Sequence, residues 1–189
     1  RTKVLFDTNQ FLQKARDDDE ILTITANQLM KLLDRDIVLY PVEENGLGTA
    51  RFFSAGGGEA EELLTSNEKA VAAWVWKNNK HAGATTNTLE SAKCLYLSIR
   101  INDTVYGVDG IRMGGVPLDS FENSVVLSIL GECALALENS RNAREKAQAK
   151  LLAQNEQLRA NLLRAISHDL RTPLTSISGN ASNLISNGN

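Results

Sequence analysis

The clearest pattern in the chain is an alternation of apolar and polar positions over residues 94–112. Every second residue from Leu95 to Ile101 is leucine or isoleucine, which is the period-2 pattern of a strand that buries one face. Asn102 and Asp103 then supply residue types that favour a tight turn. The pattern therefore predicts an antiparallel β-hairpin.

The second face of this hairpin carries Tyr96, Ser98 and Arg100. If the turn has two residues, Gly107 and Asp109 of the partner strand join the same face. A polar face with small positions is suited to line a small-molecule pocket, so Tyr96, Ser98, Arg100 and Asp109 are candidate ligand-binding residues. A sheet face covered by solvent or by a loop explains the same pattern, and this alternative stays open.

Helices and strands alternate through the rest of the first 118 residues. Acidic residues 17–20 precede an apolar series at helical spacing and predict a helix start. The run DIVLYPV at 36–42 predicts a strand, and a turn leads from it to TARFFS at 49–54. The sequence TSNE at 65–68 is a capping box for a helix that continues to about Asn79.

A last helix is predicted to begin at Asp119 or Ser120, and it is apolar on nearly all sides. Such a helix must be buried on more than one side, so we expect it to pack on its own sheet and on a partner chain. The order helix, strand, strand, helix, strand, strand, helix predicts an α+β domain. This segment resembles a GAF domain, a cytosolic sensory module whose antiparallel sheet is flanked by helices. The resemblance implies dimerisation through terminal helices.

The composition changes after this domain. All aromatic residues lie in the first 121 positions, and no proline occurs between Pro117 and Pro173. Within the proline-free stretch, Leu151, Leu158 and Leu162 fit the a and d positions of a heptad, which predicts a short parallel coiled coil. Asn155 at a further a position would set its register.

Charge and motifs argue against several classes of protein. The net charge of −3 gives no broad basic surface for nucleic acid. The longest wholly apolar run, 70–76, is far shorter than the roughly 20 residues that span a bilayer. Cys94 and Cys133 lie in apolar surroundings without a local cluster of cysteine and histidine, so we expect buried thiols and no metal site. The sequence AGGGEAEE lacks the Lys-Ser/Thr of a P-loop.

The sequence ISHDLRTPLTSI holds the strongest chemical signal. A helical register places Thr172 four residues after His168, on the same face, and Asp169 is the immediate neighbour of the imidazole. The ring of Pro173 collides with the carbonyl of residue i−4 and bends a helix. The arrangement predicts an exposed histidine that a carboxylate can activate, beside a bend. An ordinary exposed histidine before a helix end is the alternative.

The string SHDLRTPL, after NLLRAI and before TSI, resembles the H-box of sensor histidine kinases. The resemblance implies that His168 is the phosphoacceptor, taking the γ-phosphoryl group of ATP on a ring nitrogen. It implies that Asp169 assists this transfer and that Thr172 is linked to dephosphorylation of the response regulator. Pro173 would be the kink of the family. Leu163 stands where many members carry phenylalanine, a hydrophobic exchange.

The hairpin and the H-box together are similar to the KdpD-type potassium and osmotic sensor kinases. The resemblance implies a GAF-like domain at 1–138, a coiled-coil signalling helix at 139–160 and an incomplete first phosphoacceptor helix at 161–189. It further implies a homodimer through the 119–165 helix and a response regulator that controls potassium uptake. The parent would be a bacterial inner-membrane protein with this segment in the cytoplasm.

The same resemblance implies that ATP and Mg are bound by a separate ATP-binding domain of the parent. That domain is not in this chain, so we expect the chain alone to bind neither group and to be inactive as a kinase. The ligand of the GAF-like domain is not identified by any residue pattern. A dimeric small-molecule sensory module whose output is not phosphorylation is the alternative function.

Overall fold

The structure is a computed structural model that describes residues 2–187, with side-chain surroundings for residues 3–173. Two compact units divide the chain at Arg141. Residues 188 and 189, the end of the predicted phosphoacceptor segment, lie outside the described residues. The elements in chain order are α1 (Thr2–Gln13), α2 (Asp18–Leu33), β1 (Ile37–Glu43), β2 (Gly46–Leu47), β3 (Arg51–Phe53), the 3₁₀ helix η1 (Ala60–Glu62), α3 (Ser66–Asn78), β4 (Ala82–Gly83), β5 (Cys94–Ile101), β6 (Thr104–Arg112) and α4 (Ser120–Asn187).

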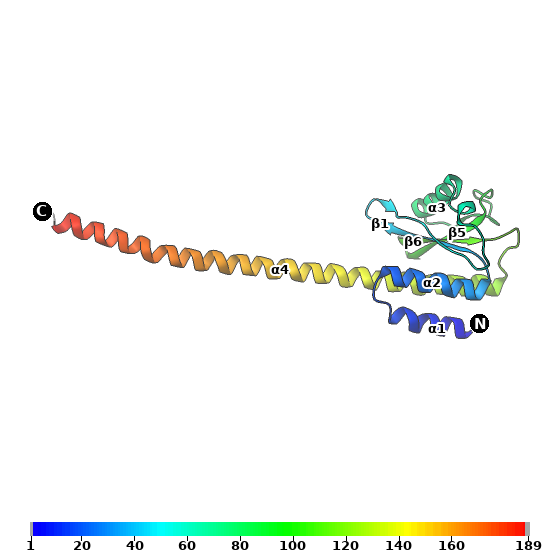
Figure 1. The fold of residues 1–189 in the computed structure, drawn as a ribbon, viewed down its shortest axis with the longest axis horizontal. Coiled ribbons are helices and arrows are strands. Elements are labelled where there is room, and N and C mark those ends of the chain that lie inside the picture. The colour runs from blue at the N-terminus through cyan, green and yellow to red at the C-terminus, as the bar shows by residue number, and fades with distance from the viewer. Residues whose placement is uncertain (1, 188–189) are drawn as a thin grey trace. The chain divides into compact units, whose positions relative to one another are not determined.

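The first unit is built on one antiparallel sheet with the strand order β2-β1-β6-β5-β4, and β3 pairs with β1 beside β2. Helices α1 and α2 and the start of α4 lie on one face of this sheet, and α3 lies on the other (Figure 1). This arrangement confirms the predicted α+β class and the predicted hairpin, which is formed by β5 and β6.

The sheet separates two hydrophobic cores. On one side, Leu29 of α2, Ile99 of β5 and Ile129 of α4 are fully buried in one cluster. On the other side, Tyr96 of β5 and Val75 of α3 are fully buried in a second cluster. Each such side chain contributes about 1.5–3 kcal/mol when it leaves water. The sheet is therefore a central layer with both faces covered.

The predicted helix starts are confirmed by their caps. The side chain of Asp17 accepts from the backbone N–H of Glu20 at 2.8 Å before α2, and Thr65 accepts from the third residue of α3 at 3.3 Å. Both helices end in a left-handed residue, Asp34 and Asn79, each with a φ of 52°. The N–H of such a residue satisfies a carbonyl of the last helical turn.

The register of the hairpin differs from the predicted one. The pairing shifts by one residue between Ile99 and the turn, and Tyr106 is the extra residue of a β-bulge on β6. Asp109 therefore lies opposite Leu97, on the face covered by α2 and α4. The prediction that Asp109 shares a face with Tyr96 is wrong, because one inserted residue moves every following side chain to the other face.

Helix α4 begins at Ser120, as predicted, and its first turns belong to the core. Val126, Ile129 and Ala134 have no exposed surface. An 18-residue window of the helix has a mean hydropathy of 1.3, which is enough for a membrane span by length and composition. Val125, Ile129 and Leu130 are buried against the sheet of the same unit, while Leu127 and Leu135 are 53% and 49% exposed. Core packing therefore accounts for part of this hydropathy.

Gly110 of β6 provides a test of how tightly the α3 side of the sheet is packed. A Cβ at this position would lie 2.6 Å from the ring of the fully buried Tyr96. We expect Gly110→Ala to lower the free energy of unfolding by roughly 1–3 kcal/mol, because neither the ring nor the strand has room to move. Urea unfolding at equilibrium measures this loss.

The control is Gly131→Ala in α4, where a Cβ would meet nothing within 4 Å. This change should raise the free energy of unfolding by about 0.5–1 kcal/mol, since alanine restricts the unfolded chain more than glycine does. Equal effects of the two substitutions would contradict the packing described here.

Candidate functional site

His168 lies on the exposed surface of α4 in the second unit. Its side chain is 79% exposed and that of Asp169 is 85% exposed, and imidazole Nδ1 lies 3.8 Å from Oδ1 of Asp169. The carboxylate is thus beside one ring nitrogen, and a small rotation brings it to hydrogen-bond distance. The other ring nitrogen, Nε2, is available to a reactant from solvent.

Thr172 and Pro173 follow on the same helix. The hydroxyl of Thr172 donates to the carbonyl oxygen of His168 at 3.5 Å, a back-bond that weakens the helix slightly. Pro173 lies inside α4, and the helix continues beyond it to Asn187. The alternative that Pro173 ends the helix is therefore wrong, while the predicted kink stays a prediction.

A shallow surface hollow of about 390 Å³ lies beside the imidazole. Its lining residues are Asn161, Arg164, Ala165, His168 and Asp169. The hollow places one guanidinium and one carboxylamide within a turn or two of the histidine. Such groups attract an anionic reactant and donate hydrogen bonds to it.

The second candidate site is the polar side of β5, and the structure places helix α3 there. The hydroxyl of Tyr96 donates to Oε1 of Glu68 at 3.0 Å, near the start of α3. At the other end, the hydroxyl of Ser98 donates to Oδ1 of Asn79 at 3.0 Å, and Nη1 of Arg100 donates to the Asn79 carbonyl at 2.8 Å. Three of the four predicted ligand residues therefore hold both ends of α3 against the sheet.

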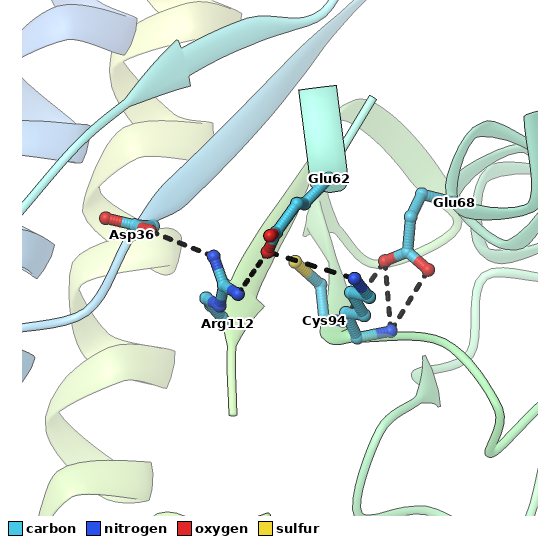
Figure 2. Close-up of polar contacts among 6 residues, drawn as sticks. Asp36, Glu62, Glu68, Cys94 and Arg112 are labelled. Carbon is cyan, nitrogen blue, oxygen red and sulfur yellow. Dashed lines mark hydrogen bonds and ion pairs between the residues drawn. The ribbon is translucent and has the colours of Figure 1, made fainter. Parts of the chain in front are cut away.

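Glu68 makes contacts that differ from those predicted from the capping box. A glutamate at this position of a capping box reaches back to the start of its own helix. Here its carboxylate turns to β5 and accepts from the backbone N–H groups of Lys93 and Cys94 (Figure 2). The residue is only 2% exposed. Nothing in the local sequence signals this contact, because its partners lie some 25 residues further along the chain.

A second polar network in Figure 2 joins the end of β6 to the preceding loops. Arg112 bridges Asp36, at 3.4 Å, and Glu62 of η1, and the hydrogen bond from Arg112 holds the pKa of Glu62 below its usual range. Asp36 also accepts from the N–H of Ala55 at 2.9 Å. A Cβ at Gly58 would lie 2.3 Å from a carboxylate oxygen of Asp36, which explains the glycine in this loop.

Asp109 is an isolated acid in the core beneath α2 and α4. It has no exposed surface, and neither carboxyl oxygen has a hydrogen-bond partner. Burial raises the pKa of this carboxyl well above its usual range, because the charged form loses its hydration without compensation. Burial thus favours the protonated form of Asp109, which lies opposite Leu97 and not opposite Tyr96.

Both cysteines are free and buried. Burial raises the pKa of the Cys94 thiol and of the Cys133 thiol to about 12, so neither is a thiolate nucleophile near neutral pH. Among residues 3–173, no group of three or more His, Cys, Asp and Glu side chains is placed to hold a metal ion.

Comparison with known proteins finds similar proteins for both units of the chain. The family model for the His Kinase A (phospho-acceptor) domain matches residues 158–188. Sensor protein KdpD of Clostridium acetobutylicum is 35% identical over 190 residues, covering 100% of this chain and 21% of that protein. Sensor protein KdpD of Escherichia coli is 27% identical over 184 residues, covering 96% of this chain and 20% of that protein.

The chain is similar in sequence to one segment of the KdpD sensor proteins. It spans about a fifth of the length of these curated relatives. The native GAF domain of the potassium sensor histidine kinase KdpD from E. coli has the same fold, with a TM-score of 0.65 at 16% identity over 78% of this chain and 99% of that one. The GAF domain of an Acinetobacter phosphoenolpyruvate-protein phosphotransferase follows at a TM-score of 0.55 and 12% identity, over 75% of this chain and 94% of that one.

The raised pKa of Asp109 leads to a stability test. Between the unfolded pKa near 3.9 and the higher folded pKa, the folded chain holds one more proton than the unfolded chain. The stability that this proton supplies is complete below pH ~3.9 and is lost as pH rises through the folded pKa, by up to about 1.4 kcal/mol per pH unit. Asp109→Asn removes this contribution and should flatten the decline.

Urea unfolding of both proteins between pH 4 and pH 9 measures the difference. The control is Asp103→Asn at the exposed turn of the same hairpin, which should leave the pH profile of the wild type unchanged. Parallel profiles for the wild type and Asp109→Asn would show that Asp109 is ionised in the folded protein.

Proposed function

We propose that the chain is the regulatory and phosphoacceptor segment of a two-component sensor histidine kinase, in which His168 is phosphorylated. The observation that carries this proposal is the exposed imidazole of His168, with a carboxylate 3.8 Å from Nδ1, inside a stretch that matches the phospho-acceptor family model. A catalytic histidine of this kind must be reached by a separate ATP-binding domain, and its high exposure is what such an encounter requires.

The chemistry follows from the two ring nitrogens. Nε2 attacks the γ-phosphorus of ATP, the N–P bond forms, and ADP leaves. The ring then carries positive charge, and Asp169 stabilises it by accepting a hydrogen bond from Nδ1–H. In the second step an acceptor carboxylate of the response regulator attacks phosphorus, the N–P bond breaks, and neutral His168 is restored. Thr172, one turn further on, is proposed to orient water for dephosphorylation of the regulator.

We also propose the domain division stated from the sequence: a sensory domain at 1–138, a signalling helix at 139–160 and the first phosphoacceptor helix at 161–189. Dimerisation through the 119–165 helix is supported by its uncovered apolar side chains. Leu151 and Leu158 are each 58% exposed and Leu162 is 55% exposed. Leucines at heptad spacing on a water-facing helix are stabilised when a second helix covers them.

The parent protein is proposed to be a membrane-bound bacterial sensor with this segment in the cytoplasm. ATP, with Mg as its metal cofactor, is proposed to bind a separate catalytic domain, and the response regulator is proposed to control potassium uptake. Support for the potassium link comes from the relatives, which are KdpD sensor proteins. The signal that the first unit detects is left open by this proposal.

The phosphoacceptor role is tested in the full-length parent sensor with labelled ATP. His168→Gln should abolish acid-labile phosphate, because the only proposed phosphorylated nitrogen is removed. His81→Gln is the matched control, since His81 is the other histidine of the chain and is also exposed. Asp169→Asn should slow labelling by roughly 10²-fold or more, the usual contribution of a positioned acid or base.

Label retained in His168→Gln, or lost equally in His81→Gln, would overturn the proposal. If ATP binds but the wild type takes up no label, the first unit would instead be a dimeric sensory module with another output.

Dimerisation is tested by placing charge in the proposed seam. Leu151→Glu with Leu158→Glu should weaken self-association by at least about 100-fold, because two buried leucines are lost and carboxylates face each other. Ala153→Glu with Ala160→Glu adds the same charge at outward heptad positions and should leave association nearly unchanged. Analytical ultracentrifugation measures both, and equal weakening by the two pairs would contradict the proposed seam.

A further inference from the structure

The start of β5 presents a small set of hydrogen-bond donors that converge on one carboxylate. The N–H of Lys93 lies 3.2 Å and 3.0 Å from the two oxygens of Glu68. The N–H of Cys94 and the hydroxyl of Tyr96 donate to Oε1 at 3.1 Å and 3.0 Å. Oxygen Oε1 thus receives three donors, and Oε2 receives one.

These donors form a closed and neutral environment. Glu68 is 2% exposed and Tyr96 is fully buried. Lys93 contributes its backbone N–H, while its ammonium group is directed to Glu62 at 3.8 Å. The binding energy of a carboxylate that is held only by neutral donors depends on how well those donors are aligned. Among these donors no cation is present whose longer-range attraction would still hold a poorly aligned carboxylate. Figure 2 shows the oxygens of Glu68 directed at this end of β5.

We propose that the N–H groups of Lys93 and Cys94 and the hydroxyl of Tyr96 form a carboxylate-binding site, which Glu68 fills in place of a diffusible ligand. The inference concerns the α3 side of the sheet and is independent of the phosphoacceptor role of His168. In this proposal the ligand of the polar face of β5 is the side chain of Glu68, which belongs to α3.

The donor set is suited to a carboxylate in particular. Two oxygens about 2.2 Å apart on a planar group match two adjacent backbone N–H groups and one hydroxyl. Burial raises the pKa of the Tyr96 phenol far above its usual range, so the hydroxyl keeps its proton and remains a donor at any physiological pH. The ring of Tyr40 lies 6.5 Å from that of Tyr96, and its buried hydroxyl has no hydrogen-bond partner.

The length of the glutamate side chain defines the size of the ligand. Replacing Glu68 with alanine removes Cγ and the carboxyl group, which are the heavy atoms of one acetate ion. Acetate therefore fits the vacated space with its carboxylate on the same donors. Because Glu68 is tethered on α3, its effective concentration is far above that of a free anion, and the wild type should not bind acetate.

The test uses purified chain of the wild type and of Glu68→Ala, titrated with sodium acetate against sodium chloride at equal ionic strength. Both tryptophans, Trp74 and Trp76, lie on α3, so thermal unfolding followed by tryptophan fluorescence reports this helix directly. We expect a lower Tm for Glu68→Ala and recovery of Tm with acetate, with a dissociation constant on the order of 1–10 mM for so small a ligand.

Three further samples identify the donors. Acetamide has the shape of acetate, but its NH₂ group is a donor and cannot accept a hydrogen bond from the N–H groups of the site. It should therefore not restore Tm. In Glu68→Ala with Tyr96→Phe, acetate should bind about tenfold or more weakly, because a hydrogen bond to a charged group is removed. Glu68→Asp keeps negative charge at the start of α3 but is one methylene too short for β5, so it should lose stability as well.

The outcomes separate this site from a simple helix-end effect. If Glu68→Asp is as stable as the wild type, the charge at the α3 terminus is sufficient and the proposal is wrong. It is also overturned if acetate and chloride act alike on Glu68→Ala, or if removing the Tyr96 hydroxyl leaves acetate affinity unchanged. If Glu68→Ala does not fold without acetate, refolding in acetate but not in chloride or acetamide supports the site.

Discussion

Burial of strand β5 on both faces is the constraint around which the first unit is organised. Leu97 and Ile99 are covered by α2 and α4, while Cys94 and Tyr96 are covered by α3. The first half of this strand, Cys94 to Leu97, is buried on both sides, so each polar group there needs a partner within the protein. The contacts to the two ends of α3 meet this requirement.

Helix α4 has to satisfy two opposite demands. Its first turns place Ile129 and Ala134 in the core, where close packing restricts their movement. Its later turns expose His168 to solvent, as the proposed phosphoacceptor role requires. The helix meets both demands by changing composition along its length, from apolar on nearly all sides to charged with a narrow leucine stripe.

Local patterns in the sequence were sufficient for most elements. The hairpin was predicted from residues 94–101 and the turn at Asn102, and the helix starts were predicted from Asp17 and Thr65, because caps and turns depend on neighbours in the chain. Helix α1 was missed, since its apolar positions do not form one buried stripe: Phe6 and Phe11 are 63% and 46% exposed. The two-residue strands β2 and β4 depend on pairing alone and leave no pattern of their own.

The sequence by itself determined the candidate site at His168, because the histidine, its neighbouring carboxylate and the threonine lie within five residues on one helix. The α3 side of the sheet was decided only by tertiary structure. The bulge at Tyr106 places Asp109 on the opposite face of the sheet from the predicted one. The carboxylate of Glu68 accepts hydrogen bonds from β5 and not from the start of its own helix. Pairing register and contacts between distant segments follow from packing the whole domain, and neither has a local signal for a sequence pattern to detect.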